Sequence, residues 1–343
     1  MNKRRIDAGA SGGLNFAIVP PANITPQGLA TQLNVVDSTA AISAIEQKRG
    51  SRVVCLTYND QPPAACALAF PVTTALGQIL SAMGKVPKLD LVLRTTGGAA
   101  EIPWRIVSIL REFTDVLGVI VSNFALSGGC HIAIAADELV MGPCAMLGPV
   151  DPTRNHPLLP KDPKNETIPT SVQDLKHCIQ FIQEQLGDSY AQQDLAVIVS
   201  ELFKYINPLA LGALEQTYNL SRLITRKVLA THRDRLPDEK VEKIIDVLSG
   251  KYFSHAFPIS RADVESDLGL HVTRPDEELI TLIGSLEAQY LLEFQKAVPA
   301  VANTVDPLVH VGGLLQTTEI GLAIAIVKKR DGTQISDSWI KFR

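Results

Sequence analysis

The chain has 343 residues, of which 46% are hydrophobic and 20% are charged, as is typical of a globular protein that buries a core. The formal net charge of -4 and the isoelectric point near 6.0 argue against a nucleic-acid-binding protein, because such proteins present a basic face. No apolar run reaches the roughly 18 residues of a membrane-spanning helix, so no integral membrane segment is expected.

The amino-terminal segment and the cysteines bear on the cellular compartment. Residues 1–21 are basic at their start but lack the apolar core of a secretory signal. The five cysteines are odd in number and show no CxxC spacing, which favours free thiols in a reducing cytoplasm. The Gly-, Pro- and Asn-rich residues 1–34 are predicted to form an N-terminal arm.

Helical and strand patterns alternate along the first half of the chain. The first helix has an N-cap candidate at Asp37 or Ser38 and ends at Gly50. In chain order, the predicted elements are a helix (37–50), a strand (52–59), a helix (73–86), a strand (89–95), a helix (99–113), a strand (117–123), a helix that Ser127 opens, and a short strand (138–142). This alternation predicts a mainly parallel sheet with functional sites at the carboxyl ends of its strands.

In the second half of the chain, helices and strands no longer alternate regularly. A Pro-rich loop over 151–170 leads into a helical region over 171–250 that is predicted to stop at Gly250. Residues 251–272 are expected to be extended and then to form a short helix, and 277–297 a longer helix. Two strand-like runs flank Asp331 and Gly332, a pair that predicts a β-hairpin.

Two glycine pairs lie in predicted loops that follow successive strands. The motif TTGG at 95–98 brings Gly97 and Gly98 to the start of a helix, where backbone N–H groups can approach a substrate closely and form an oxyanion hole. In the second motif, Ser127 precedes Gly128 at another helix start, which suits a presented nucleophile. In the alternative interpretation both pairs only make tight turns, and Ser127 caps its helix.

A serine nucleophile needs a base, and histidines are the first candidates. The seven histidines are His131, His156, His177, His232, His255, His271 and His310. His131 follows Ser127 by four residues on the same helix and is interpreted as a packing residue. His156 lies in a polar loop that could reach the site. His255 lies in the apolar segment FSHAFPI, either as an oriented base or as a semi-buried packing residue.

Three segments together resemble a known family: RTTGGAA, ALSGGCHIAIAADELVMGPCAMLGPVDP and SHAFPISRADVESDLGL. They resemble the Clp-fold serine proteases, above all the serine dehydrogenase proteinase (SDH) family, which is related to signal peptide peptidase A. The resemblance implies a ClpP/crotonase-type ββα spiral, here with a helical insertion and a C-terminal β-hairpin. The expected divisions are the arm, a protease domain over 35–275 that contains the helical segment 171–250, and a C-terminal extension over 276–343.

The resemblance also implies a catalytic triad in the order Ser, Asp, His. Ser127 is then the nucleophile, His255 the base and Asp151 the residue that orients it. A changed order is acceptable because a triad is defined by geometry. Three alternatives stay open: Asp151 only turns its Asp-Pro loop, Asp137 is the acid, or a lysine such as Lys161 is the base, as in signal peptide peptidase A.

For the oxyanion hole, the resemblance implies the backbone amides of Gly97, Gly98 and Gly128. The expected function is that of a cytoplasmic serine endopeptidase that cleaves polypeptides through an acyl-enzyme, without a metal or cofactor. A homo-oligomer and a regulatory protein partner are also expected, as for other Clp-fold proteins. The alternatives are a crotonase-type enzyme acting on acyl-CoA thioesters and a non-catalytic scaffold.

Overall fold

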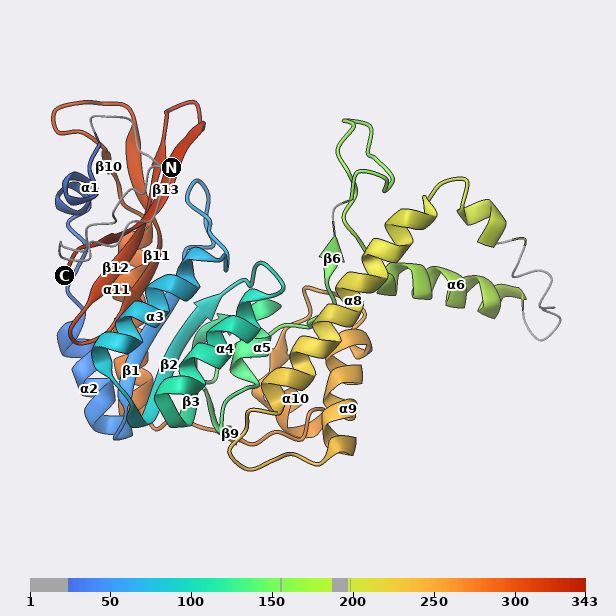
Figure 1. The fold of residues 1–343 in the computed structure, drawn as a ribbon, viewed down its shortest axis with the longest axis horizontal. Coiled ribbons are helices and arrows are strands. Elements are labelled where there is room, and N and C mark those ends of the chain that lie inside the picture. The colour runs from blue at the N-terminus through green and yellow to red at the C-terminus, as the bar shows by residue number, and fades with distance from the viewer. Residues whose placement is uncertain (1–23, 155, 187–196, 198) are drawn as a thin grey trace, which may run out of the picture.

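The computed structural model describes residues 24–154, 156–186, 197 and 199–343. The segment in which no secretory signal was predicted, and most of the predicted N-terminal arm, lie outside these residues. Residues 26–33 of that arm form a helix, α1 (Pro26–Leu33). Figure 1 shows a body built around one large sheet, with a helical projection to one side.

The centre of the sheet is parallel, as the alternation of elements predicted. Its strands run in the order β1-β2-β3-β4-β9, and each adjacent pair is parallel. The bounds of these strands are β1 (Arg52–Tyr58), β2 (Val86–Thr95), β3 (Thr114–Ala125), β4 (Glu138–Met141) and β9 (Val272–Thr273). The loops that follow β1, β2 and β3 therefore meet at one edge of the sheet.

An antiparallel half continues the same sheet beyond β1. The predicted hairpin forms between β12 (Gly321–Lys328) and β13 (Gln334–Lys341), with Gly332 at a φ of 88° in the turn. The sequence did not predict β11 (Leu308–Gln316), which pairs with both β1 and β12, or the short β10 (Ala297–Pro299) beside it. Through β11 the hairpin is joined to the central sheet.

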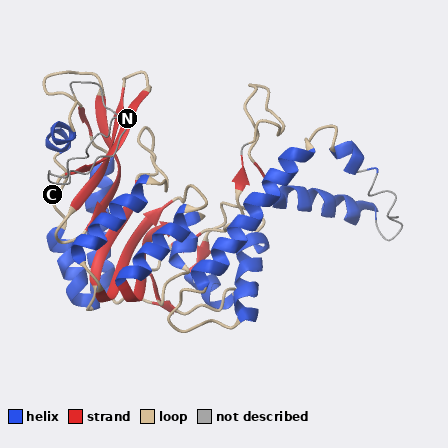
Figure 2. Cartoon of the chain, viewed as in Figure 1, coloured by secondary structure: helices blue, strands red, loops and turns tan. Residues whose placement is uncertain are grey.

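Helices cover both faces of the sheet (Figure 2). On one face, the helices packed into the larger core are α3 (Pro71–Met83), α4 (Ile102–Phe113), α5 (Gly128–Ala133), α8 (Pro208–Leu229), α9 (Asp238–Asp246) and α10 (Arg261–Ser266). On the other face lie α1, α2 (Thr39–Arg49) and α11 (Glu277–Phe294). Strand β1 shows why both faces need cover: Val54 and Leu56 point into one core, Val53 and Cys55 into the other.

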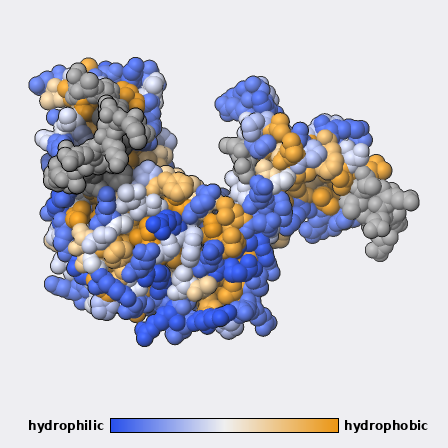
Figure 3. All heavy atoms as spheres, viewed as in Figure 1, coloured by the Kyte–Doolittle hydropathy of each residue, from blue (hydrophilic) through white to orange (hydrophobic). Residues whose placement is uncertain are grey.

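The helical segment forms the projection (Figure 1). It consists of α6 (Val172–Leu186) and the first half of α8, with a two-stranded sheet of β6 (Thr153–Arg154) and β7 (Thr170–Ser171) at its base. Its own core is small, and large apolar side chains gather on its surface (Figure 3). None of the helices in the described ranges is long and apolar enough to cross a bilayer.

The segment that carries His255 departs from the sequence prediction. The α-helix α9 ends at Asp246, and a π-helical turn, η2 (Val247–Lys251), continues through Gly250, which was predicted to end the helix. Residues 252–256 then form turns, and only the two residues of β8 (Ile259–Ser260) are extended enough to pair, with β5 (Met146–Leu147).

Candidate active site

Ser127 occupies a strained turn between β3 and α5. Its backbone angles are φ 49° and ψ -114°, a conformation that costs a non-glycine residue free energy and is found mainly at functional sites. The Ser127 side chain makes no capping hydrogen bond to α5, so capping does not explain the serine. Strained strand-to-helix turns of this kind expose the nucleophilic hydroxyl of α/β-hydrolases.

The loop after β2 packs against this turn so closely that only glycine fits. A Cβ on Gly97 would lie 2.9 Å from Gly128 N and from Ser127 Cβ, and one on Gly98 would lie 2.2 Å from Leu68 O. Both glycines have positive φ, 102° and 153°. Leu68 holds the loop from its other side: its N–H donates to Gly97 O (2.7 Å), and its carbonyl accepts from Ala99 N (2.9 Å).

Two amides at this place are available to a ligand. Gly97 N–H donates to Thr95 Oγ1 at 3.1 Å, so it is already engaged. In the described part of the chain, the N–H groups of Gly98 and Gly128 donate to no protein acceptor, and both residues line one cavity with Ser127. Free, fixed backbone donors are suited to a developing oxyanion.

Asp151 and His255 are brought together by strand pairing. β5 and β8 are antiparallel, with Leu147 opposite Ile259. Asp151 lies four residues after Leu147, and His255 lies four residues before Ile259. Because the strands are antiparallel, the chain segments that carry Asp151 and His255 extend from this pair in the same direction, next to each other. A backbone hydrogen bond from Val150 N to Leu248 O (3.0 Å) also ties the segment of Asp151 to η2, the turn that precedes His255.

The two side chains form a charge-assisted contact. His255 Nδ1 lies 3.0 Å from Asp151 Oδ1, and this hydrogen bond raises the pKa of His255 despite an opposing effect of burial. The Asp151 side chain is 14% exposed and that of His255 38%. Because Nδ1 contacts the carboxylate, Nε2 is the nitrogen left for a reaction partner.

Ser127 and His255 line the same cavity, which has a volume of about 340 Å³. Gly98 and Gly128 line it too, together with Thr217 and Ser221 from α8. No hydrogen bond joins Ser127 Oγ to the His255 ring in the described structure. Catalytic hydrogen bonds are often formed only in the substrate complex. The relevant observation is therefore that Ser127 and His255 line the same cavity. The described residues hold no cluster of three or more acidic, His or Cys side chains that could bind a metal.

His131 also lines this cavity, which sequence reasoning did not anticipate. It is 5% exposed, and its Nε2 lies 3.0 Å from Thr225 Oγ1 and 3.5 Å from Ser221 Oγ. Both hydroxyls donate their single hydrogen to backbone carbonyls, Thr225 to Ser221 O and Ser221 to Val150 O. This arrangement favours the tautomer with the proton on His131 Nε2, and burial lowers the pKa of the ring to about 4, which keeps it neutral.

The hydroxyl residues of α8 also went unnoticed in the sequence. Thr217, Ser221 and Thr225 are spaced by four residues, so they share one helix face. That periodic stripe within an otherwise apolar helix face was the available signal. It brings polar groups to the cavity and hydroxyl partners to His131.

The structure separates the alternative candidates from the cavity. Asp137 pairs with Arg111, with Oδ2 2.6 Å from Arg111 Nη1, and accepts a hydrogen bond from Leu117 N. Lys161 and His156 lie in the loop before α6 and do not line the cavity that contains Ser127. None of the three contacts the Asp151–His255 pair.

The fold and the site indicate a Clp-fold serine protease, and comparison with known proteins supports this class. Residues 18–160 match the family of ClpP-like SDH-type serine proteinases. The matched region contains the TTGG loop, Ser127 and Asp151, whereas His255 lies beyond it. The resemblance read from the sequence and the ClpP/crotonase-type fold are thereby confirmed, and the match supports a serine peptidase.

Two curated relatives are uncharacterized proteins of Methanocaldococcus jannaschii. MJ1495 is 30% identical over 182 residues, which cover 47% of this chain and 62% of the relative. MJ0137 is 27% identical over 246 residues, which cover 70% of this chain and 74% of the relative. The matched region of the chain thus spans less than two thirds of the length of MJ1495.

Solved structures with detectable likeness include two proteases and an enoyl CoA isomerase. A mutant of the 1510-N membrane-bound stomatin-specific protease is 10% identical, with a TM-score of 0.35 and coverage of 67% of this chain and 81% of that chain. A ClpP1 mutant from Listeria monocytogenes is 11% identical, with a TM-score of 0.34 and coverage of 68% and 99%. An enoyl CoA isomerase from M. smegmatis is 14% identical, with a TM-score of 0.32 and coverage of 70% and 79%. Such low TM-scores support no transfer of residue roles.

Proposed function

We propose that this protein is a serine endopeptidase that cleaves polypeptides through an acyl-enzyme. One observation carries the proposal: a single cavity is lined by Ser127, by two unengaged amides, and by His255, which Asp151 holds from behind. These are the groups that acyl transfer needs, namely a nucleophile, an oriented base and an oxyanion hole.

In the proposed reaction, Ser127 Oγ attacks the carbonyl carbon of the scissile peptide bond. Its proton passes to His255 Nε2, and the Asp151 carboxylate stabilises the imidazolium through Nδ1–H. The amides of Gly98 and Gly128 bind the oxyanion, and Gly97 lets the loop approach. His255 then protonates the leaving amine as the C–N bond breaks, and a water molecule hydrolyses the acyl-enzyme by the same steps.

The neutral His131 supports this assignment of roles. Its Nε2 hydrogen is directed to the hydroxyls of α8, and its low pKa makes it a poor proton acceptor at neutral pH. His255 has the opposite properties, since its carboxylate partner favours the protonated ring. Between the two histidines that line the cavity, His255 is therefore the base.

Active-site labelling tests the proposal. We expect a fluorophosphonate probe to modify the wild type at Ser127, as located by peptide mass spectrometry, and to leave the Ser127→Ala variant unmodified. Ser81→Ala is the matched control because Ser81 is exposed on α3 and donates only to Gly77 O, and it should be labelled like the wild type. Undiminished labelling of the Ser127→Ala protein would refute the assignment, and turnover of acyl-CoA thioesters without peptide cleavage would favour the crotonase-type alternative.

A further inference from the structure

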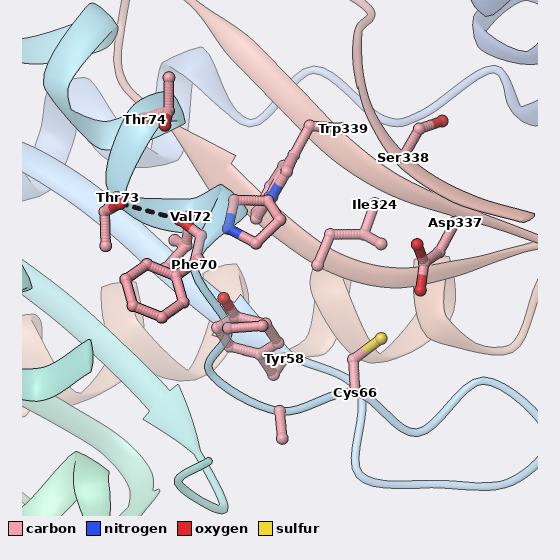
Figure 4. A pocket seen from close by; sticks show the side chains of 13 residues that line it. Tyr58, Cys66, Phe70, Val72, Thr73, Thr74, Ile324, Asp337, Ser338 and Trp339 are labelled. Carbon is pink, nitrogen blue, oxygen red and sulfur yellow. Dashed lines mark hydrogen bonds between the residues drawn. The ribbon is translucent and has the colours of Figure 1, made fainter. Parts of the chain in front are cut away.

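A second, larger cavity lies beside the C-terminal hairpin and has a volume of about 430 Å³. Figure 4 shows that Phe70 and Val72 enter it from the start of α3, while Ile324 and Trp339 enter from β12 and β13. Ile324 and Trp339 are direct partners in the strand pairing, and Tyr58 at the end of β1 lies between the two groups. The wall is therefore aromatic and aliphatic on several sides.

The chemistry of the wall favours an uncharged apolar group. Burial raises the pKa of the Cys66 thiol to about 11, so this side chain remains neutral. Asp337 adds a carboxylate at one end of the cavity (Figure 4) and accepts a hydrogen bond from Gln334. A carboxylate ligand would be repelled there, whereas a large apolar side chain would bury its surface against Trp339 and Phe70.

The position of this cavity relates it to the candidate active site. It opens at the carboxyl end of β1, and Ser127 follows β3, with the TTGG loop of β2 between them. Leu68 connects the two places: its backbone pairs with the TTGG loop, and its Cδ1 would lie 3.4 Å from a Cβ on Gly128. The neighbouring Ala67, Ala69 and Phe70 line the second cavity.

The spacing suits one extended peptide. Neighbouring strands lie about 4.8 Å apart, so the β1 side of the cavity lies about 10 Å from β3 and its wall on β12 about 20 Å, distances that an extended chain covers in about three to six residues. Both sites also lie on the same face of the sheet, because Tyr58, Leu68 and Ala125 belong to one core. A peptide at Ser127 that crosses the TTGG loop therefore reaches the hairpin cavity.

We propose that the hairpin cavity is a substrate subsite that binds a bulky apolar side chain about three to six residues from the scissile bond. This inference rests on the proposed peptidase function. It assigns a role to β12 and β13, which bring Ile324 and Trp339 to the edge where the active-site loops lie. It also assigns a specificity, with Phe, Leu or Trp preferred over Ala at that substrate position and Asp disfavoured.

Peptide binding to the inactive protein tests the subsite without any requirement for turnover. The Ser127→Ala protein with Trp104→Phe leaves Trp339 as its only tryptophan, so its fluorescence reports on the cavity. Peptides of equal length that carry Phe, Ala or Asp at one scanned position are titrated. We expect the Phe peptide to perturb Trp339 fluorescence and to bind at least tenfold more tightly than the Asp peptide.

Matched variants locate the binding. Phe70→Ala should weaken the Phe peptide about tenfold, whereas Phe181→Ala on α6 should not, although the two phenylalanines are similarly exposed at 65% and 61%. Thr74→Phe, at an exposed cavity-lining residue of α3, should block the subsite in the same way without adding a second tryptophan. Equal effects of Phe70→Ala and Phe181→Ala, or no preference for Phe over Asp, would overturn the inference.

Two further outcomes separate this inference from the proposed function. If Phe peptides bind through Phe70 and Trp339 but the wild type cleaves no peptide, the binding site stands and the peptidase proposal fails. If N-acetylphenylalanine amide binds in the cavity but no peptide does, the cavity takes a small ligand and the subsite is refuted. In the active wild type, mass spectrometry of a peptide library should show large apolar residues enriched about three to six positions from the cut.

Discussion

At the residue scale, the candidate site depends on a few groups whose environments differ in charge and burial. Ser127 is placed in a strained conformation that no capping bond explains, and two histidines line its cavity with opposite properties. His131 is buried among hydroxyls and stays neutral, while Asp151 raises the pKa of His255. Such a divergence between neighbouring titratable groups is how acid–base roles are usually separated.

The Asp151→Asn variant tests the residue pair through its pH dependence. His255 acts as a base only when neutral, so kcat/KM should rise with pH and level off above the pKa of His255, which Asp151 raises from its usual value. Without the carboxylate, the largest effect that raises this pKa is lost while burial still lowers it, so the rising limb should move to lower pH. The plateau should fall by about 10⁴, the loss seen for this change in the Ser-His-Asp template.

The measurement is a pH profile of cleavage of a fluorogenic peptide, with an NMR titration of the His255 ring as an activity-independent readout. Asp137→Asn is the control, because Asp137 pairs with Arg111 and makes no contact with His255. A rising limb that stays in place in Asp151→Asn would contradict the assigned contact.

At the element scale, the site is assembled from loops at the carboxyl ends of parallel strands. The loop after β2 supplies Gly98, the turn after β3 supplies Ser127 and Gly128, and the β5–β8 pairing aligns Asp151 with His255. Leu68, in the segment after β1, holds the β2 loop by two backbone hydrogen bonds. The functional groups thus come from several elements, so a small shift of one loop would move its groups away from the others.

The Gly98→Ala variant tests this dependence. The new Cβ would lie 2.2 Å from Leu68 O and 2.4 Å from Leu68 N, and the loop would have to move and take its amide with it. We expect kcat to fall by about 10² to 10³, the usual loss for one oxyanion donor. Gly77→Ala is the control: nothing lies within 4 Å of its Cβ, so activity should be retained and stability should rise by about 0.5–1 kcal/mol.

Steady-state kinetics measure the effect of each variant on kcat, and thermal unfolding measures its effect on stability. A folded Gly98→Ala protein with wild-type kcat would show that the loop carries no oxyanion donor.

At the scale of the whole molecule, the chain is one sheet with a projecting helical segment. The projection carries exposed apolar side chains, including Phe181 (61% exposed), Tyr205 (76%) and Leu209 (73%), and its small core gives it little independent stability. Exposed apolar surface of this kind is typical of interaction sites. It supports the expectation that copies of this chain, or a regulatory protein, contact the projection.

Light scattering tests this expectation. We expect the wild type to form a homo-oligomer at micromolar concentration and Leu209→Ser with Tyr205→Ser to shift it toward smaller species, because both changes remove apolar contact area. The distant Ile280→Ser on α11, where Ile280 is 39% exposed, should leave the oligomer unchanged. A monomeric wild type would contradict the expectation.

Much of the central architecture could be predicted from the chain alone. The helix that ends at Gly50 and the strands β1 to β4 follow from periodicity and from breaker residues, which are local properties. The path of the chain through η2 and the turn at His255 could not be predicted, because a helix that passes Gly250 is stabilised by packing of Leu248 in the core. Strand β11 was missed because its glycines weaken the strand pattern.

The sequence by itself determined the alternating parallel core, the two glycine motifs and the family resemblance, because these depend on neighbouring residues and their spacing. Only the tertiary structure decided which side chains meet. Asp151 and His255 are 104 residues apart, His131 reaches α8 across 94 residues, and the hairpin cavity joins the segment after β1 to the end of the chain. Such contacts depend on long-range strand pairing and core packing, and no local pattern in the sequence encodes them.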